Sequence, residues 1–189
     1  MKTTVDTKAL ADAVRAVGKF LPTRSAIASL AHYRIEAHSG IVAVTAFDME
    51  SGRRVEVEAE VETEGEALLP PAFGKVVTGS NASDVAIDVS DTEAKIAAGK
   101  ARATLRIGNL DDYPQAEPEL YDDPIPVPGW ERMRSVAVAA SSDTNRPAIC
   151  TVKLEETQAI ATDAYRLAWA EVTESTDHPE VLIPPRAIQ

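Results

Sequence analysis

The fold of this chain is decided by the stretch Ala159-Ile160-Ala161-Thr162-Asp163-Ala164-Tyr165-Arg166-Leu167-Ala168-Trp169-Ala170-Glu171-Val172. A weaker copy of its context stands earlier, at residues 42–55. Each copy follows an amphipathic run, a loop that carries an arginine, and an alternation of apolar residues. These segments are residues 7–19, 22–27 and 33–37 before the first copy, and residues 130–140, 144–149 and 150–154 before the second. The pattern predicts one module of helix, loop and strands, used at least twice.

A further unit lies between the two copies. Its short apolar run at residues 72–77 predicts a helix, and the segments 85–89, 94–98 and 103–107 predict strands. Residues 180–189 resemble the beginning of this unit and then stop. We therefore expect the first half of a second pair of units at the end of the chain, apparently truncated.

A segment rich in proline and acid, residues 121–129, is where we divide the chain. The predicted domains are residues 1–121 and residues 122–189. The first has an ordinary size for a domain, whereas the second is near the lower limit for independent stability. The second is expected to need a further half.

The net charge of -11 argues at first against nucleic acid, since phosphate binding needs clustered Lys and Arg. Distribution overrules this total if basic and acidic residues occupy different surfaces. Acids do gather in an alternating stripe that predicts a solvated sheet face. The stripe consists of Glu56, Glu58, Glu60, Glu62, Glu64 and Glu66.

The beginning of the chain carries charges within its first helical run and has no apolar core of a signal peptide or membrane span. Cys150 is the only cysteine, which excludes an internal disulfide and fits a reducing compartment. These features predict a cytoplasmic protein.

Four marks stand in a definite order: the loop of Arg24, residues 110–114 (Leu-Asp-Asp-Tyr-Pro), residues 161–168 (Ala-Thr-Asp-x-x-Arg-Leu-Ala) and residues 181–186 (Val-Leu-Ile-Pro-Pro-Arg). In this order and spacing, nearly the whole chain resembles the bacterial DNA polymerase III beta-subunit sliding clamp. The resemblance implies an α+β DNA clamp fold with two units of helix plus antiparallel strands in each domain. It also implies a homodimeric ring that encircles duplex DNA without sequence preference. Such a ring tethers the polymerase, catalyses no reaction and needs no cofactor.

Basic side chains on the predicted helices are the candidates for DNA contact. In the first helix Leu10, Val14, Val17 and Leu21 mark the buried stripe, and basic residues lie on the other side. An ordinary solvated face is the alternative. Because clamp helices line the pore, the resemblance favours Arg15 and Lys19, with Lys75 in the second helix and Arg132 and Arg134 in the third.

Arg24 and Arg146 occupy matching loops directly after a helix in two repeats. Each is able to pair with a nearby carboxylate, which is the alternative interpretation. Their occurrence in both copies favours a shared role, and in clamps such loops reach the DNA backbone. Forked guanidinium donors suit phosphate contact that reads no base sequence.

The corner at residues 162–167 is itself a tight connection in which Asp163 satisfies backbone donors. The resemblance also implies that it forms half of the pocket where polymerases, the clamp loader and repair proteins insert a short peptide motif. Ala164 stands where the family often has glycine, and Tyr165 where it often has histidine. The predicted near wall consists of Ile149, Thr162, Tyr165, Arg166 and Leu167.

The strand at residues 100–107 is, by the same resemblance, the edge at which another subunit binds, since unpaired strand edges invite pairing. Leu105 is expected in the apolar contact, with Ala103 and Ile107 beside it. Ala103 stands where the family often has a larger apolar residue.

Enzyme signatures are not found: the three histidines lack metal spacing, and the sequence has no glycine-rich phosphate loop or nucleophile elbow. Asp48 and Asp163, or the pairs at 111–112 and 122–123, are conceivable Mg²⁺ ligands, but equivalent corners of a repeat explain the first two better. We predict no metal, no catalysis and no membrane association. The alternative function is a short peptide-binding interaction module that does not encircle DNA.

Overall fold

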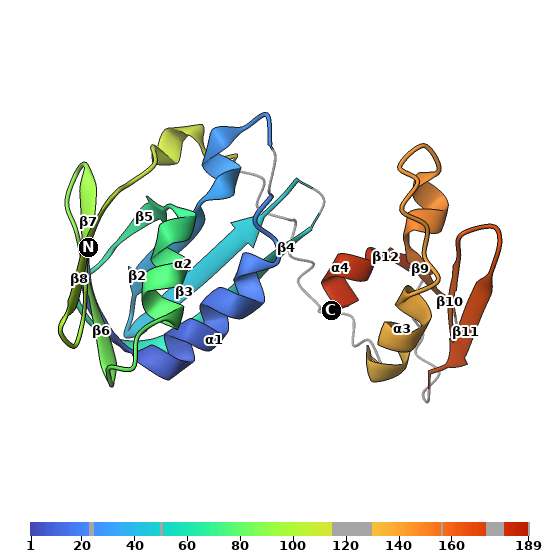
Figure 1. The fold of residues 1–189 in the computed structure, drawn as a ribbon, viewed down its shortest axis with the longest axis horizontal. Helices are drawn as coiled ribbons and strands as arrows, with labels where there is room; N and C mark the ends of the chain where they lie inside the picture. The colour runs from blue at the N-terminus through green and yellow to red at the C-terminus, as the bar shows by residue number, and fades with distance from the viewer. Residues whose placement is uncertain (23–24, 50, 115–129, 156, 173–179, 189) are drawn as a thin grey trace. The chain divides into compact units, whose positions relative to one another are not determined.

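The computed structural model describes the whole chain except residues 23–24, 50, 115–129, 156, 173–179 and 189. The chain divides into two compact units, Met1–Ala116 and Glu117–Gln189 (Figure 1). The predicted division after residue 121 lies among residues 115–129, outside the described residues, and stays a prediction. Each unit has its own hydrophobic core.

Unit 1 is built on an eight-stranded antiparallel sheet in the order β5-β2-β3-β4-β1-β6-β7-β8. The long strand β4 joins its two halves, because β4 pairs with β3 through Gly52 to Glu58 and with β1 near its other end. The strands are β1 (Lys2–Asp6), β2 (Tyr33–His38), β3 (Ile41–Phe47), β4 (Gly52–Thr63), β5 (Gly65–Leu69), β6 (Asp84–Val89), β7 (Glu93–Ala98) and β8 (Ala101–Arg106).

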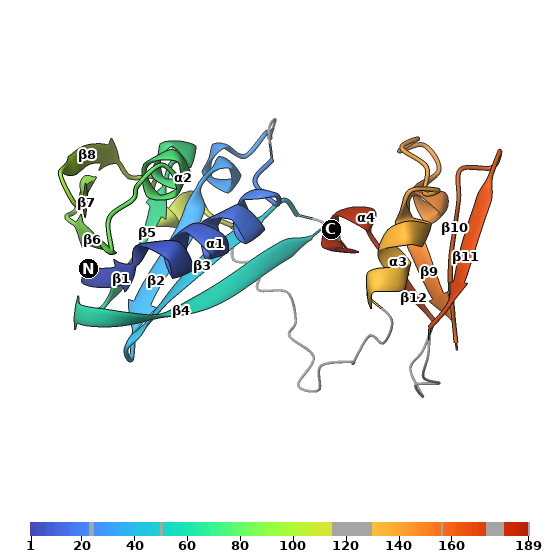
Figure 2. The ribbon, with the colours of Figure 1, turned by 60° about the horizontal axis from the view of Figure 1, so that its bottom comes forward.

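Two helices, α1 (Thr7–Gly18) and α2 (Pro71–Thr78), lie side by side on one face of this sheet (Figures 1 and 2). Leu10, Val14 and Val17 of α1 are buried, as the apolar spacing predicted. A Cβ on Gly74 of α2 would stand 2.8 Å from Oη of Tyr33. The glycine therefore lets the two helices and β2 approach one another.

The opposite face of the sheet is charged. Arg34 of β2 lies 2.9 Å from Glu66, and Arg54 of β4 pairs with Glu36 and Glu56. Part of the acidic stripe is therefore paired across strands, on a solvated face as predicted. At one end of this face a small cluster of Leu30, Leu68 and Tyr113 is covered by residues near the short 3-10 helices η1 (Ala28–Ala31) and η2 (Leu110–Asp112).

Unit 2 has a four-stranded antiparallel sheet in the order β11-β10-β9-β12. Met133 and Val136 of helix α3 pack on it together with Ile188 of α4. The helix ends at Ala137 and is therefore shorter than the predicted run 130–140. Ala139, which lies beyond its end, is still buried. The elements are α3 (Trp130–Ala137), the 3-10 helix η3 (Pro147–Cys150), β9 (Val152–Glu155), β10 (Gln158–Thr162), β11 (Leu167–Glu171), β12 (Val181–Ile183) and α4 (Pro185–Ile188).

The repeat predicted from sequence is visible in the corners that begin at Asp48 and Asp163. In each corner the aspartate N–H donates to the carbonyl three residues on, at 3.0 Å to Ser51 and 3.3 Å to Arg166. The following residue, Met49 or Ala164, has a φ of 77° in both. The predicted α+β class, with repeated units of helix and antiparallel strands, is confirmed.

Candidate functional site

The cationic residues predicted on α1 are exposed at its last turn. Asp6 caps the helix by accepting from the N–H of Ala9 at 2.8 Å. Arg15 lies 2.8 Å from Asp12, and both side chains are more than half exposed. Lys19, just past the helix, is exposed as well, as is Lys75 on α2. A surface pair of this kind contributes little stability, so Arg15 is available for another anion.

Two arginines of α3 are exposed but tied at one point to their own unit. Arg132 donates to the carbonyl of Glu171 at 2.8 Å, and Arg134 donates to that of Ile188 at 3.0 Å. Each guanidinium has several further N–H donors. These side chains therefore support unit 2 and keep donors for a ligand.

Arg146 adopts the alternative considered for it, since its Nε donates to Oδ2 of Asp143 at 3.0 Å. The N–H of Asn145, and then Arg146 itself, hold the pKa of Asp143 below its usual value. The side chain of Arg146 stays half exposed. Its counterpart Arg24 lies outside the described residues.

The corner at 162–167 is organised by two side chains. Oδ1 of Asp163 accepts from the N–H groups of Tyr165 and Arg166, both at 3.0 Å. These bonds, and the Arg166 guanidinium whose Nε donates to Oδ2, lower the pKa of Asp163. The hydroxyl of Thr162 donates to the carbonyl of Arg166 at 2.7 Å. Ala164 lies in the left-handed region that favours glycine.

This corner presents apolar surface to solvent. Tyr165 is 96% exposed and Leu167 64% exposed, whereas Thr162 and Ile149 are partly buried. Ile149, at the end of the predicted loop 144–149, lies in η3, because Pro147 begins a helical turn there. Arg166 also donates to the carbonyl of Val138 at 2.8 Å, which joins the corner to the end of α3.

The strand predicted as a subunit contact lies at the sheet edge. Strand β8 pairs with β7 and has no second partner among the described residues. Ala103, Leu105 and Ile107 turn toward the core of unit 1 and pack against it partly buried. Arg102, Thr104 and Arg106 are exposed. The predicted apolar contact therefore involves side chains that already support their own domain.

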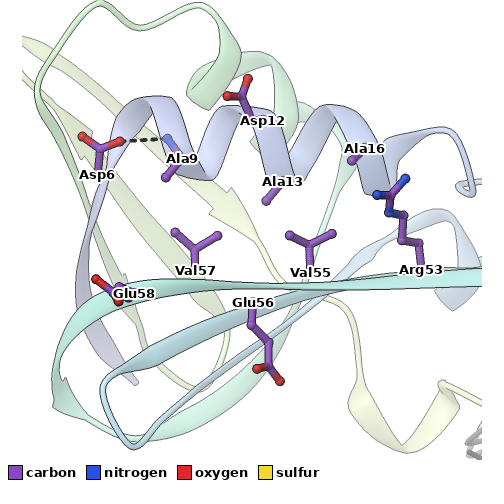
Figure 3. A pocket seen from close by; sticks show the side chains of 10 residues that line it. All are labelled: Asp6, Ala9, Asp12, Ala13, Ala16, Arg53, Val55, Glu56, Val57 and Glu58. Carbon is purple, nitrogen blue, oxygen red and sulfur yellow. Dashed lines mark hydrogen bonds between the residues drawn. The ribbon is translucent and has the colours of Figure 1, made fainter. Parts of the chain in front are cut away.

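A groove of about 610 Å³ separates α1 from β4 (Figure 3). Ala9, Ala13 and Ala16 form its helix wall, and Val55 and Val57 form its sheet wall. Of the carboxylates in this lining, that of Asp6 caps α1 and that of Asp12 pairs with Arg15.

In the part of the chain that the structure describes, no cluster of three or more histidine, cysteine or carboxylate side chains is arranged to hold a metal ion. Asp48 and Asp163, the aspartates considered as Mg²⁺ ligands, both accept backbone N–H groups in their corners. Across the same residues, no helix combines the length and apolar character needed to cross a membrane.

The family profile of the DNA polymerase III beta subunit, N-terminal domain, matches residues 1–117. The chain belongs to the DNA polymerase III beta-subunit family. A beta sliding clamp of Micrococcus luteus is 32% identical over 189 residues, which cover 96% of this chain and 61% of that protein. The beta-subunit resemblance found in the sequence is therefore confirmed.

Solved structures of beta clamps share the fold. The Caulobacter (C. crescentus) beta sliding clamp has a TM-score of 0.85 at 22% identity, covering 100% of this chain and 55% of that one. The Helicobacter pylori beta clamp bound to a DNA ligase peptide has a TM-score of 0.76 at 17% identity, with 100% and 57% covered. This chain thus spans little more than half the length of these beta subunits.

Two residues of this beta-subunit chain that the sequence reasoning missed lie beside the corner. Val138 was counted within a helix, but the early end of α3 leaves its side chain exposed. Trp169 was counted only as part of the repeat, yet it is an exposed aromatic residue on β11. The two-residue spacing of Leu167 and Trp169 was the available signal, because it places both side chains on one face of a strand.

Proposed function

We propose that this chain acts as part of a DNA sliding clamp, which encircles duplex DNA without sequence preference and holds the replicative polymerase on its template. The observation that carries this proposal is the family match over residues 1–117. The proposed action is mechanical, takes place in the cytoplasm and needs neither a catalysed reaction nor a cofactor. We further propose a division into residues 1–121 and 122–189.

The separation of charge supports this function despite the net charge of -11. One sheet face of unit 1 carries carboxylates partly paired with arginines. On the other face, Arg15 lies in the last turn of α1 and Lys19 just past its end. A protein that stays on DNA because it encircles the duplex needs only weak contact with the phosphates. A basic helix side with an acidic exterior permits sliding and limits adhesion elsewhere.

The second part of the proposal concerns partners. The corner of Thr162, Tyr165, Arg166 and Leu167, with Ile149, is proposed to bind a short peptide motif of the polymerase, the clamp loader or repair proteins. Exposed Leu167 supports this, since an apolar anchor needs an apolar contact within a polar rim. The Helicobacter pylori beta clamp bound to a DNA ligase peptide lends further support.

The DNA assignment is tested by reversing charge on one helix. Fluorescence anisotropy of a short labelled duplex in low salt measures binding to this chain and to the double variant Arg15→Glu, Lys19→Glu. We expect the variant to bind at least about tenfold more weakly, because several phosphate contacts are lost and replaced by repulsion.

The matched control is the double variant Lys95→Glu, Arg106→Glu, which alters net charge equally at exposed positions of β7 and β8. Its side chains alternate with core residues and so face away from α1. This control is expected to bind DNA more strongly than the α1 variant. Equal losses in the two variants would mean that DNA responds to total charge, and the pore assignment would then be abandoned.

A further inference from the structure

The outer face of the sheet in unit 2 carries a row of side chains that crosses all four strands. Trp169 of β11 stands opposite Ile160 of β10, Ile160 opposite Lys153 of β9, and Lys153 opposite Leu182 of β12. Trp169 is 58% exposed and Leu182 is 49% exposed. Three members of this row are therefore apolar, on the face opposite the one that α3 and α4 cover among the described residues.

Unit 1 supplies an internal comparison, because its corner at Asp48 matches the corner at Asp163. Counting from these aspartates and following the strand register, the matching row is Arg54, Thr45, Arg34 and Leu68. Both arginines of that row form ion pairs with glutamates of the same sheet face: Arg34 with Glu36 and Glu66, and Arg54 with Glu36 and Glu56. The positions that match Trp169 and Lys153 are thus occupied by ion-paired arginines in unit 1.

The two exposed ends of the row in unit 2, Leu182 and Trp169, have counterparts in unit 1 that differ in burial. Leu68, which matches Leu182, is fully buried with Tyr113 and forms a bridge with Gly108. In unit 1, that end of the row is therefore covered by residues of the same unit. Arg54, which matches Trp169, faces solvent. The repeat accounts for an apolar residue at Leu182 but not for one at Trp169.

Trp169 is continuous with the proposed peptide site, since it lies two residues from Leu167 on the same face of β11. We propose that Trp169, backed by Ile160, is a second anchor point for the bound peptide and selects partners with two apolar side chains in an extended segment. This inference rests on the proposed peptide binding. It adds a specificity-determining residue to that site.

The spacing defines the partner. Side chains on one face of a strand repeat every ~7 Å, so an extended peptide laid along β11 places residues two positions apart over Leu167 and Trp169. Lys153, the charged member of the row, already pairs with Glu155 at 2.9 Å and Glu180 at 3.2 Å. The second anchor is therefore apolar, and an aromatic side chain gives the largest contact with the indole.

The test uses the full chain and two short synthetic peptides. One has leucine and phenylalanine two positions apart among serines and glycines, and the other has serine in place of the phenylalanine. In a Trp130→Phe background Trp169 is the only tryptophan left, so its emission reports contact directly. We expect the peptide with two anchors to bind about tenfold more tightly and to shift this emission to shorter wavelength.

Anisotropy of the labelled peptides then separates the roles of the residues. Trp169→Ala and Trp169→Arg, the latter introducing the residue of unit 1, are each expected to remove the difference between the two peptides. Leu182→Ala, an exposed apolar change on the same face, is expected to preserve it. A melting curve of each variant verifies folding. We expect the variants at Trp169 to stay folded because this side chain is exposed.

The outcomes are distinct. If both peptides bind the parent chain equally and the emission stays fixed, Trp169 is no anchor, while the proposed peptide site stands. If Leu167→Asp leaves the peptide with one anchor bound as before, the proposed site itself is wrong. If neither peptide binds, both ideas are overturned.

Discussion

At the scale of single residues, Asp163 holds the peptide corner together. Its carboxylate accepts two backbone N–H groups and the Arg166 side chain, and these contacts stabilise its charged form. Protonation of this carboxylate leaves its oxygens in place but makes them weaker hydrogen-bond acceptors. The corner is thus an electrostatic structure as much as a turn.

We expect Asp163→Asn to lower the melting temperature at neutral pH. The pKa of Asp163 in the folded chain is lower than its usual value of 3.8, so its stabilising contribution is present above that value. The contribution is lost as the pH falls through the lower, folded pKa. Melting temperatures of parent and variant should therefore converge in acid. Asp91→Asn, in the exposed turn between β6 and β7, serves as the control, and an equal pH dependence in both variants would contradict the assignment.

Gly74 shows why helix propensity alone misleads. Alanine is intrinsically better than glycine in a helix by ~1 kcal/mol. Here its Cβ would stand 2.8 Å from Oη of Tyr33 and 3.2 Å from Cγ1 of Val14. We expect Gly74→Ala to destabilise unit 1 by about 1–3 kcal/mol in urea unfolding.

Removing the obstructing atom provides the matched test of this clash. In a Tyr33→Phe background, Gly74→Ala should cost clearly less, because the hydroxyl oxygen nearest the new Cβ is gone. The coupling between the two sites is read from the double-mutant cycle. Strict additivity would show that Tyr33 does not cause the cost.

At the scale of elements, the hydrogen bonds of β8 show which of its backbone N–H groups point to the open edge of the sheet. The N–H of Ile107 donates to Thr92, on the β7 side, and that of Gly108 donates to Leu68, on the other side. Backbone groups alternate along a strand, so the N–H of Thr104 points to the open edge. Leu105 points inward, which makes a substitution there disturb the domain as well as any contact.

Thr104→Pro is therefore the cleaner test of the proposed subunit edge. It removes one edge donor without breaking the ladder to β7. We expect self-association by sedimentation to weaken about tenfold, roughly the loss of one well-made hydrogen bond, while the melting temperature of unit 1 changes little. A chain that sediments as the same monomer with and without this change would exclude β8 as a contact between copies.

Elements also show where sequence reasoning succeeds and where it ends. Strong periodicity predicted α1 and its buried Leu10, Val14 and Val17. The predicted end of α3 was wrong because tertiary contacts decide where this helix ends. Arg166 donates to the carbonyl of Val138, and the N–H of Ser141 donates to the carbonyl of Ile149. The pairing of Arg146 with Asp143 was one of two open interpretations, since a guanidinium finds its partner only after the loop is folded.

At the scale of the whole molecule, the two units have separate cores. Phe73, Ile87 and Ile96 are buried in the first, and Met133 and Leu154 in the second. The repeat and the fold class followed from local patterns that each unit contains. The role of the helix faces followed only from resemblance, because charge on a helix does not by itself identify its ligand.

Separate cores predict separate unfolding transitions. Ile87→Ala should lower only the transition of unit 1, and Leu154→Ala only that of unit 2, each by about 2–5 kcal/mol. Urea denaturation followed by Trp130 and Trp169 reports unit 2, because both tryptophans belong to it, while far-ultraviolet circular dichroism reports both units. A single transition that both substitutions move equally would show that the units unfold together.

The position of β1 between β4 and β6 has a consequence for biosynthesis. Lys2 to Asp6 pair with residues near Val61 on one side and with Asp84 to Asp88 on the other. During translation at roughly 5–20 residues per second, β1 therefore waits roughly 4–16 s for β6 to be made. For that time α1, which follows directly, exposes Leu10, Val14 and Val17 without a finished sheet beneath them. A nascent chain of this fold thus keeps an apolar helix face without its sheet partner until β6 has been made.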